Sequence, residues 1–588
     1  MCGIFGYIGQ KNNAAHLVLD GLKKLEYRGY DSWGIAVAVD NKLVVKKKAG
    51  KISGAKINHL PASNFGLGHT RWATHGGVTD INAHPHLDCS GKIAIIHNGI
   101  IENYDQIKKN LLKSGHKFVS ETDSEVAAHS IEEYSKKLPF LEAVRKAFLE
   151  FEGLNAIIAM NSQTFEFVAG KTGSPLVVGF GKGENFLASD APALLSHTRR
   201  VHFLEDGEVV KVTKDKVVLF DGKTGKIKRP KIQTLDWKIE AVEKGKYSHF
   251  MLKEMNEQPQ ILLDIAANGA ERVQKLAAYI KKSYGSYMVA CGTASYACIA
   301  GSYLFSKISH RHINWAVGSE FGYQLDFLTP KSLVIALSQS GETIDTIEAV
   351  KKAKAKKVKI FALVNVLGST LYREADYKLL IGAGVEKAVA STKAFSGKLA
   401  HLTMLAYAIA GRIQEGQSVV IQAAKASQKV LGDESVNKIR RLAKKIRDKK
   451  HIYVIGRGLS YPASLETALK IKEISYVHAE GFAAGELKHG VIALVEEGTP
   501  CIAFLPNDET YGANLAGAME MKARGGYIIG ISHKPHEVFD YYIPVEDAKE
   551  ATIIPNVIVG QLLAYYLTLE RHYDPDKPRN LAKSVTVK

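Results

Sequence analysis

The pattern of apolar and polar positions changes character near residue 225. Before that point the chain carries many short β-branched runs separated by turns and only a few helical patterns. Examples of these runs are 34–39, 43–46, 92–97 and 211–220. This texture predicts an α+β domain over residues 1–225, built from antiparallel sheets. A Gly-, Lys- and Pro-rich stretch ends it, and a polar connector follows, so we predict a linker over 226–258.

Beyond the linker, apolar runs typical of buried strands alternate with helical patterns, and the alternation is repeated. Residues 287–296 align with 452–461, and residues 333–343 align with 500–510 at nearly the same offset. Two matched segments at almost one spacing indicate a duplicated βαβ unit. We therefore predict two α/β parallel-sheet domains, over 259–430 and 431–577, followed by a C-terminal tail, 578–588.

Composition favours a multidomain protein of the cytoplasm. A chain of 588 residues exceeds what one hydrophobic core supports. The net charge of +18 comes from lysines spread along the chain, so we expect a solvated surface and no nucleic-acid partner. The most apolar window, Val557 to Leu569, is interrupted by Gly560 and Gln561, which argues against a membrane span. The start does not resemble a signal peptide, which predicts a cytoplasmic location.

Motifs for nucleotides and metals are incomplete. Gly222-Lys223-Thr224 lacks the earlier glycine of a P-loop, and Gly456-Arg457-Gly458 lacks the third glycine of a dinucleotide motif. Five cysteines and a group of histidines show no metal-binding spacing, and we expect solvent or hydrogen-bonding roles for the histidines. These residues are Cys2, Cys89, Cys291, Cys298, Cys501, His69, His75, His84, His86 and His97. The sequence therefore predicts neither a metal nor a cofactor.

Cys2 is the first candidate for chemistry. Removal of Met1 would leave a cysteine whose own α-amine lies beside its thiol. The amine titrates near ~8 and the thiol near ~8.5, so the amine can accept the thiol proton without a histidine. This arrangement is typical of an acyl-transfer nucleophile. The alternative is a small apolar residue at the start of a strand.

The segment 338–343, Ser-Gln-Ser-Gly-Glu-Thr, follows an apolar run and precedes a helical pattern. Ligands bind where strands end and helices begin, because free backbone amides point there. Its hydroxyls and its glycine suit a phosphate monoester, although a helix cap alone would explain the same residues. The second repeat has Leu505-Pro506-Asn507-Asp508 instead, so we expect phosphate binding in the first repeat alone.

A predicted helix over 464–478 places Glu466, Lys470 and Glu473 on one face, opposite an apolar side. An exposed Glu–Lys pair explains this spacing as well as catalysis does. The residues alone leave both interpretations open.

Together these segments resemble known families. The N-terminal motifs resemble the glutaminase domain of class II amidotransferases, an α+β N-terminal nucleophile fold with antiparallel sheets between helices. They are 1–6 (MCGIFG), 27–32 (YRGYDS), 69–76 (HTRWATHG), 82–86 (NAHPH), 97–103 (HNGIIEN) and 121–123 (ETD). The repeat resembles the sugar isomerase (SIS) domain. With the ending 578–587, the whole chain resembles the glutamine:fructose-6-phosphate aminotransferase family, which uses L-glutamine and D-fructose 6-phosphate.

The resemblance implies specific roles. Cys2 attacks glutamine, Asn98 and Gly99 form the oxyanion hole, and Trp72 gates an internal ammonia channel. Glu473 moves a proton with help from Lys470, Lys583 forms a Schiff base, and His489 of a neighbouring subunit opens the sugar ring in a homodimer. The glutamine-binding residues that the resemblance implies are Arg71, Trp72, Thr74, His75 and Asp123. The implied sugar-phosphate-binding residues are Thr293, Ser295, Ser338, Gln339, Ser340, Thr343 and Val389.

One departure and one competing function accompany this interpretation. Ala294 stands where the family has serine, and Ser295 is the candidate substitute. An isomerase or deglycase that works mainly through the C-terminal half is the chief alternative. A sugar-phosphate sensor would keep 338–343 without needing Cys2, Glu473 or Lys583.

Overall fold

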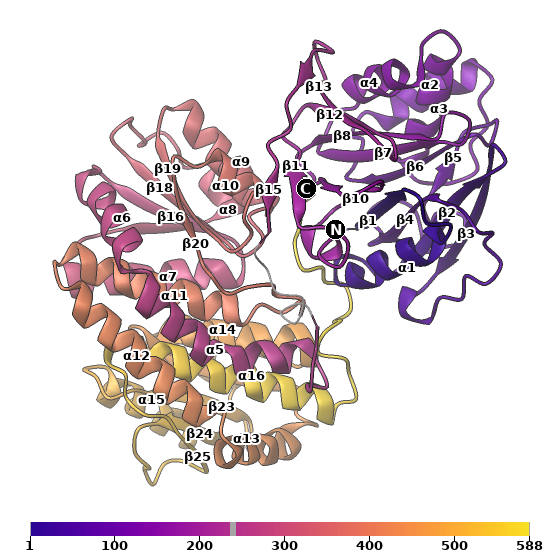
Figure 1. Ribbon diagram of the computed structural model, residues 1–588. Coiled ribbons are helices and arrows are strands. Elements are labelled where there is room, and N and C mark those ends of the chain that lie inside the picture. The colour runs from indigo at the N-terminus through magenta and orange to yellow at the C-terminus, as the bar shows by residue number, and fades with distance from the viewer. Residues whose placement is uncertain (1, 236–242, 587–588) are drawn as a thin grey trace. The chain divides into compact units, whose positions relative to one another are not determined.

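The computed structural model describes residues 2–235 and 243–586, which form two compact units (Figure 1). The first unit contains the described residues up to Glu243 together with residues 582–586 from the other end of the chain. The second unit is Lys244–Leu581.

Two antiparallel sheets form the framework of the first unit. One has the strand order β15-β11-β9-β10-β1-β4-β2-β3, and the other β14-β13-β12-β8-β7-β6-β5. The strands are β1 (Gly3–Ile8), β2 (Ser32–Val39), β3 (Lys42–Ala49), β4 (Phe65–Arg71), β5 (His86–Leu87), β6 (Ile93–Asn98), β7 (Asn155–Asn161), β8 (Glu166–Thr172), β9 (Val177–Phe180), β10 (Asn185–Ala188), β11 (Arg200–Phe203), β12 (Glu208–Val212), β13 (Val217–Asp221), β14 (Ile227–Lys228) and β15 (Gln233–Thr234).

The two sheets pack face to face, and helices cover their outer faces. Alternate residues of both sheets, such as Ile4, Ile158 and Phe167, share one buried core, as the two-residue period of a strand requires. Helix α1 (Ala14–Lys24) packs on the first sheet. Helices α2 (Tyr104–Lys113), α3 (Glu125–Ser135) and α4 (Phe140–Glu150) share a core with the second sheet. The predicted glutaminase fold class is confirmed.

The second unit contains two five-stranded parallel sheets with equivalent topology. Their orders are β17-β16-β18-β19-β20 and β22-β21-β23-β24-β25. In each sheet the first strand along the chain lies inside the sheet, the second lies on one side of it, and the later strands lie on the other side. The predicted duplication is confirmed. The strands are β16 (Ser286–Ala290), β17 (Asn314–Val317), β18 (Leu333–Ser338), β19 (Lys359–Val364), β20 (Tyr377–Leu380), β21 (His451–Gly456), β22 (His478–Ala483), β23 (Pro500–Leu505), β24 (Tyr527–Ser532) and β25 (Tyr541–Pro544).

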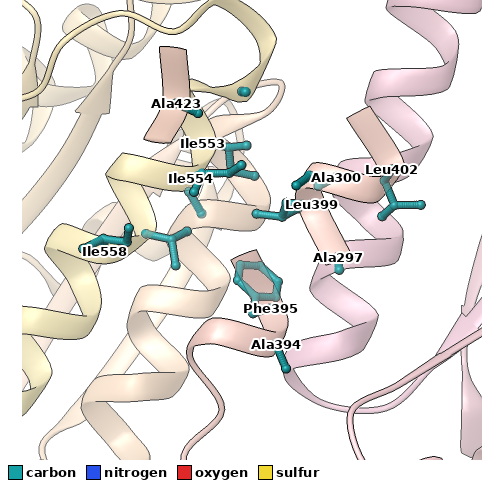
Figure 2. Packing of buried hydrophobic residues seen from close by; sticks show 14 of the residues in the cluster. Ala297, Ala300, Ala394, Phe395, Leu399, Leu402, Ala423, Ile553, Ile554 and Ile558 are labelled. Atoms are coloured by element: carbon teal, nitrogen blue, oxygen red, sulfur yellow. The ribbon is translucent and has the colours of Figure 1, made fainter. Parts of the chain in front are cut away.

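Most helices of the second unit pack with both sheets into one apolar core, and the others contribute to two separate clusters with the same sheets. Figure 2 shows the centre of the core, where Phe395 and Leu399 of α11 lie between Ala297 of α7 and Ile554 of α16. The helices are α5 (Phe250–Asn268), α6 (Ala270–Lys282), α7 (Thr293–Ser309), α8 (Gly318–Phe321), α9 (Ile344–Ala355), α10 (Thr370–Glu374), α11 (Lys393–Ile409), α12 (Ile413–Val430), α13 (Asp433–Ile446), α14 (Ser460–Ser475), α15 (Tyr511–Lys522) and α16 (Ile553–Glu570).

Among the described residues, one helical stretch, Lys549–Glu570, is long and apolar enough to cross a membrane. Within its most apolar window 89% is buried inside the protein. It contains α16, which is a core helix of the second unit, so its composition reflects packing and indicates no membrane.

The structure corrects three details of the sequence interpretation. The run 211–220 is a hairpin of β12 and β13 rather than one strand. Part of the predicted linker 226–258 is regular structure, because β14 pairs with β13 and α5 begins at Phe250. Helix α14 begins at Ser460, since Pro462 is tolerated in a first turn, and ends before Tyr476, which has a left-handed φ of 59°. The domain boundaries stay predictions.

Candidate active sites

Cys2 lies at the start of β1, beside the end of β4. Gly3 opposes Thr70 in the antiparallel register and donates its amide to Thr70 Oγ1 at 3.2 Å. A side chain at Gly3 would come within 2.5 Å of that oxygen, so glycine permits the close approach. The approach puts Cys2 Sγ 3.2 Å from the backbone amide of Trp72, which donates to it.

Asn98 and Gly99 end strand β6 next to Cys2. Asn98 Nδ2 donates to the main-chain oxygen of Cys2 at 3.0 Å. Gly99 has a φ of +138°, and a Cβ there would lie 2.1 Å from the carbonyl oxygen of Leu154. Only glycine fits this turn. The predicted oxyanion-hole residues are therefore adjacent to the predicted nucleophile.

His69 fixes the orientation of the Asn98 amide. Its Nε2 lies 3.0 Å from both Asn98 Oδ1 and the carbonyl oxygen of His97, so Nε2 carries a proton and donates to these acceptors. Burial lowers the pKa of His69 to about 3, which keeps the ring neutral at physiological pH. The bond directs Asn98 Nδ2, the donor end, towards Cys2. The predicted hydrogen-bonding role of this histidine is confirmed, although the sequence did not connect it with Asn98.

The other predicted glutamine-binding residues lie around the same end of β4. The Arg71 guanidinium is within electrostatic range of Cys2 and Asp123, and it donates to the carbonyl oxygens of residues 75–77. Asp123 Oδ2 accepts the amide of Ile101 at 2.8 Å. Trp72 and His75 are half-buried and Thr74 is exposed. Arg71 thus shapes its own loop as well as offering a positive charge near the nucleophile.

Burial raises the pKa of the Cys2 thiol above its ordinary value. The thiol therefore stays protonated near neutral pH, and the reaction needs a base to take its proton. Removal of Met1 would give Cys2 a free α-amine, and this amine would supply the base on the same residue as the thiol.

A second candidate site occupies the edge of the first parallel sheet. The chain runs from β16 to β17 on one side and then to β18 on the other, so the switch point of the sheet lies between β16 and β18. Ligands of open α/β sheets bind at such points. The loop after β16 leads through Gly292, whose φ is +55°, to Thr293 at the start of α7. The loop 338–343 follows β18.

Hydroxyls of the loop 338–343 are arranged around backbone amides. Ser338 Oγ lies 3.1 Å from Thr343 Oγ1 and accepts the amide of Gly341 at 2.9 Å. Ser340 Oγ accepts the amide of Glu342 at 3.1 Å. Gly341 has a φ of +66°, and a Cβ would lie 2.0 Å from Ser369 Oγ. This gathering of donors before helix α9 suits an anion.

Two predicted binding residues differ in detail from this set. Ser295 Oγ donates to the carbonyl oxygen of Gly292 at 2.7 Å, so its proton is engaged inside the first turn of α7. Gln339 is half-buried, and its carbonyl oxygen accepts the amide of Asn365 at 3.1 Å. The proposed substitution of Ser295 for the missing hydroxyl at Ala294 stays a prediction.

Lys470 forms the centre of a buried charged group. Its Nζ lies 2.5 Å from Glu473 Oε2 and 3.5 Å from Glu466 Oε1, and it donates to Thr293 Oγ1 at 3.0 Å. The Lys470 side chain is 1% exposed and that of Glu466 is fully buried. The alternative of a solvent-exposed Glu–Lys pair is therefore wrong. Lys470 thus joins Glu473 to Thr293, which is a predicted phosphate-binding residue, and the roles of all three stay predictions.

Two carboxylates share one lysine in this group. Burial raises the pKa of Glu466 to about 7, with the Glu473 charge adding to the effect. Although burial opposes its charge, the carboxylates of Glu466 and Glu473 hold the pKa of Lys470 above its ordinary value. The arrangement keeps a lysine–glutamate ion pair and leaves Glu466 able to hold a proton near neutral pH. Sequence reasoning noted Glu466 but gave it no role.

Glu466→Gln is expected to remove a pH dependence of stability. The pKa of Glu466 is about 7 in the folded protein against an ordinary 4.5, so its contribution is present in full below 4.5 and is lost as pH rises through about 7. Between these values the free energy of unfolding should fall by up to about 1.4 kcal/mol per pH unit in the wild type. Unfolding curves from pH 4 to 8 test this. Parallel curves for the wild type and the variant would contradict it, and exposed Glu271→Gln serves as control.

Three other predicted residues lie on other segments of the chain. Exposed His489 ends a short 3-10 helix, Glu486–His489, and among the described residues no hydrogen bond or ion pair of its side chain is seen. Val389 is buried, and its amide donates to the carbonyl oxygen of Asp576 at 3.4 Å. Lys583 is half-buried and belongs to the first unit, so its role at the sugar site stays a prediction.

The folds and sites define a glutamine amidotransferase joined to a duplicated sugar isomerase domain. A glutamine amidotransferase domain model matches residues 54–247, and a SIS domain model matches 279–408 and 445–569. Glutamine–fructose-6-phosphate aminotransferases (isomerizing) from Pyrococcus horikoshii and Caldanaerobacter subterraneus are 44% and 42% identical to the chain, each over 100% of both sequences. The chain belongs to this aminotransferase family.

A solved structure supports the fold of the C-terminal half. The C-terminal domain of glucosamine-fructose-6-phosphate aminotransferase from Francisella tularensis is 32% identical, with a TM-score of 0.52. It covers 57% of this chain and 99% of its own. The predicted family, its fold class and its repeated SIS domain are confirmed.

Proposed function

We propose that this enzyme converts L-glutamine and D-fructose 6-phosphate to L-glutamate and D-glucosamine 6-phosphate, the first step towards amino-sugar precursors. The observation that carries the proposal is the presence in one chain of two sites. One combines Cys2 with the donors at Asn98 and Gly99, and the other combines hydroxyls at a switch point with buried Lys470. The first suits amide cleavage, and the second suits a sugar phosphate.

In the first half-reaction, Cys2 Sγ attacks the side-chain carboxamide of glutamine while its α-amine takes the thiol proton. Asn98 Nδ2 and the Gly99 amide stabilise the developing oxyanion, a contribution supported by the orientation that His69 imposes. The tetrahedral intermediate expels ammonia and leaves a γ-glutamyl thioester, which water hydrolyses to glutamate. Arg71 binds the α-carboxylate, Asp123 the α-ammonium, and Trp72, Thr74 and His75 line the pocket.

In the second half-reaction, the phosphate binds Thr293, Ser338, Gln339, Ser340 and Thr343, with Ser295 and Val389 beside them. Lys583 condenses with the opened ketose as a Schiff base, and ammonia then displaces the lysine amine. Glu473 moves the proton from C1 to C2, which converts the imine of the ketose into the amino aldose. Lys470 lies 2.5 Å from Glu473 and places a positive charge beside that carboxylate.

The proposed reaction also involves a second subunit and the transfer of ammonia between two sites. His489, exposed on its short helix, opens the sugar ring of the neighbouring subunit, which makes the enzyme an obligate homodimer. Ammonia passes internally from the glutaminase to the sugar site, with Trp72 as its gate. We place the enzyme in the cytoplasm, because both substrates are metabolites. All five cysteines are free thiols, which fits a reducing compartment.

An isotope experiment tests the function. The enzyme is given fructose 6-phosphate and glutamine labelled with ¹⁵N in its amide, with excess unlabelled ammonium in solution. We expect glucosamine 6-phosphate that carries the label, measured by mass spectrometry. Absence of any glucosamine 6-phosphate would overturn the proposal and leave a sugar-phosphate isomerase. Unlabelled product would overturn internal ammonia transfer while leaving the sugar chemistry intact.

A further inference from the structure

Four side chains of the first unit, away from Cys2, bring their polar atoms together. They are Cys89, His116, His129 and Glu132, and one ligand atom of each lies within 4.8 Å of the others. Cys89 follows β5, His116 follows α2, and the other two lie one turn apart on α3. Three segments far apart in the sequence thus converge on one point. None of these residues has a role in the proposed reaction.

The distances between the polar atoms fit a tetrahedral metal site. Cys89 Sγ lies 3.7 Å from His116 Nδ1 and 3.5 Å from His129 Nδ1. Glu132 Oε2 lies 3.0 Å and 3.5 Å from the same two nitrogens. Bonds of about 2.0 to 2.3 Å to a tetrahedral Zn²⁺ put the ligand atoms roughly 3.3 to 3.7 Å apart. Three of the four distances lie in this range, and the His116–Glu132 pair at 3.0 Å would open slightly around an ion. One sulfur, two imidazole nitrogens and a carboxylate are the donors that zinc prefers.

Carboxylates also stand behind both histidines. The far nitrogen of His116, Nε2, lies 2.8 Å from Glu133 Oε2, and that of His129 lies 3.6 Å from Glu125 Oε1. Histidines that bind metals characteristically donate their other ring N–H to a carboxylate, which holds the metal-facing nitrogen unprotonated. His116 has such a hydrogen bond, whereas His129 Nε2 lies close to its carboxylate without one. Both rings place Nδ1 near Cys89 Sγ and Glu132 Oε2.

Backbone donors complete the surroundings of the sulfur and the inner carboxylate. The amide of Lys117 donates to Cys89 Sγ at 3.4 Å, and the amide of Cys89 donates to Glu132 Oε2 at 3.0 Å. Such bonds favour the anionic form of each ligand. His116 and His129 are buried whereas Cys89 is exposed, so an ion has a path from solvent.

We propose that Cys89, His116, His129 and Glu132 bind one structural Zn²⁺. Four protein ligands close the coordination sphere, which is typical of structural rather than catalytic zinc. The ion would tie the turn after β5 and the segment after α2 to helix α3. Strand β6, which ends at Asn98, follows that turn, and Asp123 lies two residues before the start of α3, so the zinc would stabilise the walls of the proposed glutamine pocket.

Zinc stoichiometry tests the proposal on the full-length protein. The protein is stripped with a chelator, reloaded with Zn²⁺, desalted and measured by plasma mass spectrometry, and its affinity is measured by competition with a chromophoric chelator. We expect one zinc per chain, lost in Cys89→Ser and His129→Ala. The control variants His59→Ala, at an exposed position, and Cys501→Ser, at a buried one, should keep it. No stoichiometric zinc in the wild type, or full retention in Cys89→Ser, would overturn the proposal.

Two further measurements keep the test independent of folding and of catalysis. Cys89 is exposed, so Cys89→Ser should fold, and zinc should raise the melting temperature of the wild type but not of this variant. Glu133→Gln, which removes an outer carboxylate, should weaken zinc binding about 10- to 100-fold. Co²⁺ should give a thiolate charge-transfer absorption that Cys89→Ser lacks. Cobalt absorption unchanged by Cys89→Ser would contradict the assignment of the ligands.

Discussion

Cys2→Ala is expected to abolish glutamine-dependent synthesis of glucosamine 6-phosphate while synthesis from ammonium ions continues. In the proposed mechanism the thiol is the nucleophile that cleaves the amide, and loss of a covalent nucleophile typically removes about 10⁶ of the rate. The phosphate loop 338–343 and Lys470 belong to the other unit of the chain, and the sugar chemistry does not need the thiol. Product formation with each nitrogen donor, measured on the same preparation, gives both rates.

Retention of one extra residue before Cys2 separates the roles of its two groups. The thiol is kept but the α-amine becomes an amide, which has no lone pair to accept a proton. Since burial raises the pKa of the thiol, its anion cannot form unaided, and glutamine hydrolysis should fall by about 10² to 10⁴. Wild-type hydrolysis by the extended chain would assign the base to another residue. Loss of ammonium-dependent synthesis in Cys2→Ala would contradict the separation of the two half-reactions.

The glutaminase site could be predicted in good part because sheet pairing brings its motifs together. The register of β1 with β4 sets Gly3 opposite Thr70, so the first motif must lie beside the motif at 69–76. Asn98 ends β6 and reaches the main chain of Cys2. The sequence did not reveal that His69 orients Asn98, because the bond joins two strands of different sheets whose packing no local pattern encodes.

Burial explains what the sequence left open in the second unit. Glu466 and Lys470 have the spacing of an exposed ion pair, and an isolated helix would present them to water. Helix α14 instead packs against α7 and α16 as well as strands β21 and β22, so its polar face is covered. Only the tertiary arrangement distinguishes the two interpretations.

The candidate zinc ligands escaped sequence reasoning for a related reason. Cys89 and His116 are 27 positions apart, and His129 is 40 positions from Cys89, so no short metal motif exists. The helical spacing of His129 and Glu132 is common to many exposed helices. Their common direction follows from the packing of α3 on α2 and on strand β5.

Glu473→Gln is expected to lower synthesis from glutamine and from ammonium alike, by about 10² to 10⁴, because it removes the proposed base of the proton transfer. Glutamine hydrolysis should continue, since Cys2 lies in the other unit. The carboxamide also loses the ion pair with Lys470, which lies 2.5 Å away. Glu271→Gln, at an exposed pair on α6, controls for loss of a glutamate charge and should keep full activity.

The same variant decides whether one sugar site needs two chains. If His489 serves the neighbouring subunit, Glu473→Gln and His489→Ala chains lack different parts of a shared site. A dimer of one chain of each kind then has one intact site out of two. Since half of randomly assembled dimers are mixed, co-expression of equal amounts should restore about a quarter of wild-type synthesis. Two inactive variants that stay inactive together, in dimers shown to be mixed by distinct tags, would place His489 in the site of its own chain and remove the reason for an obligate dimer.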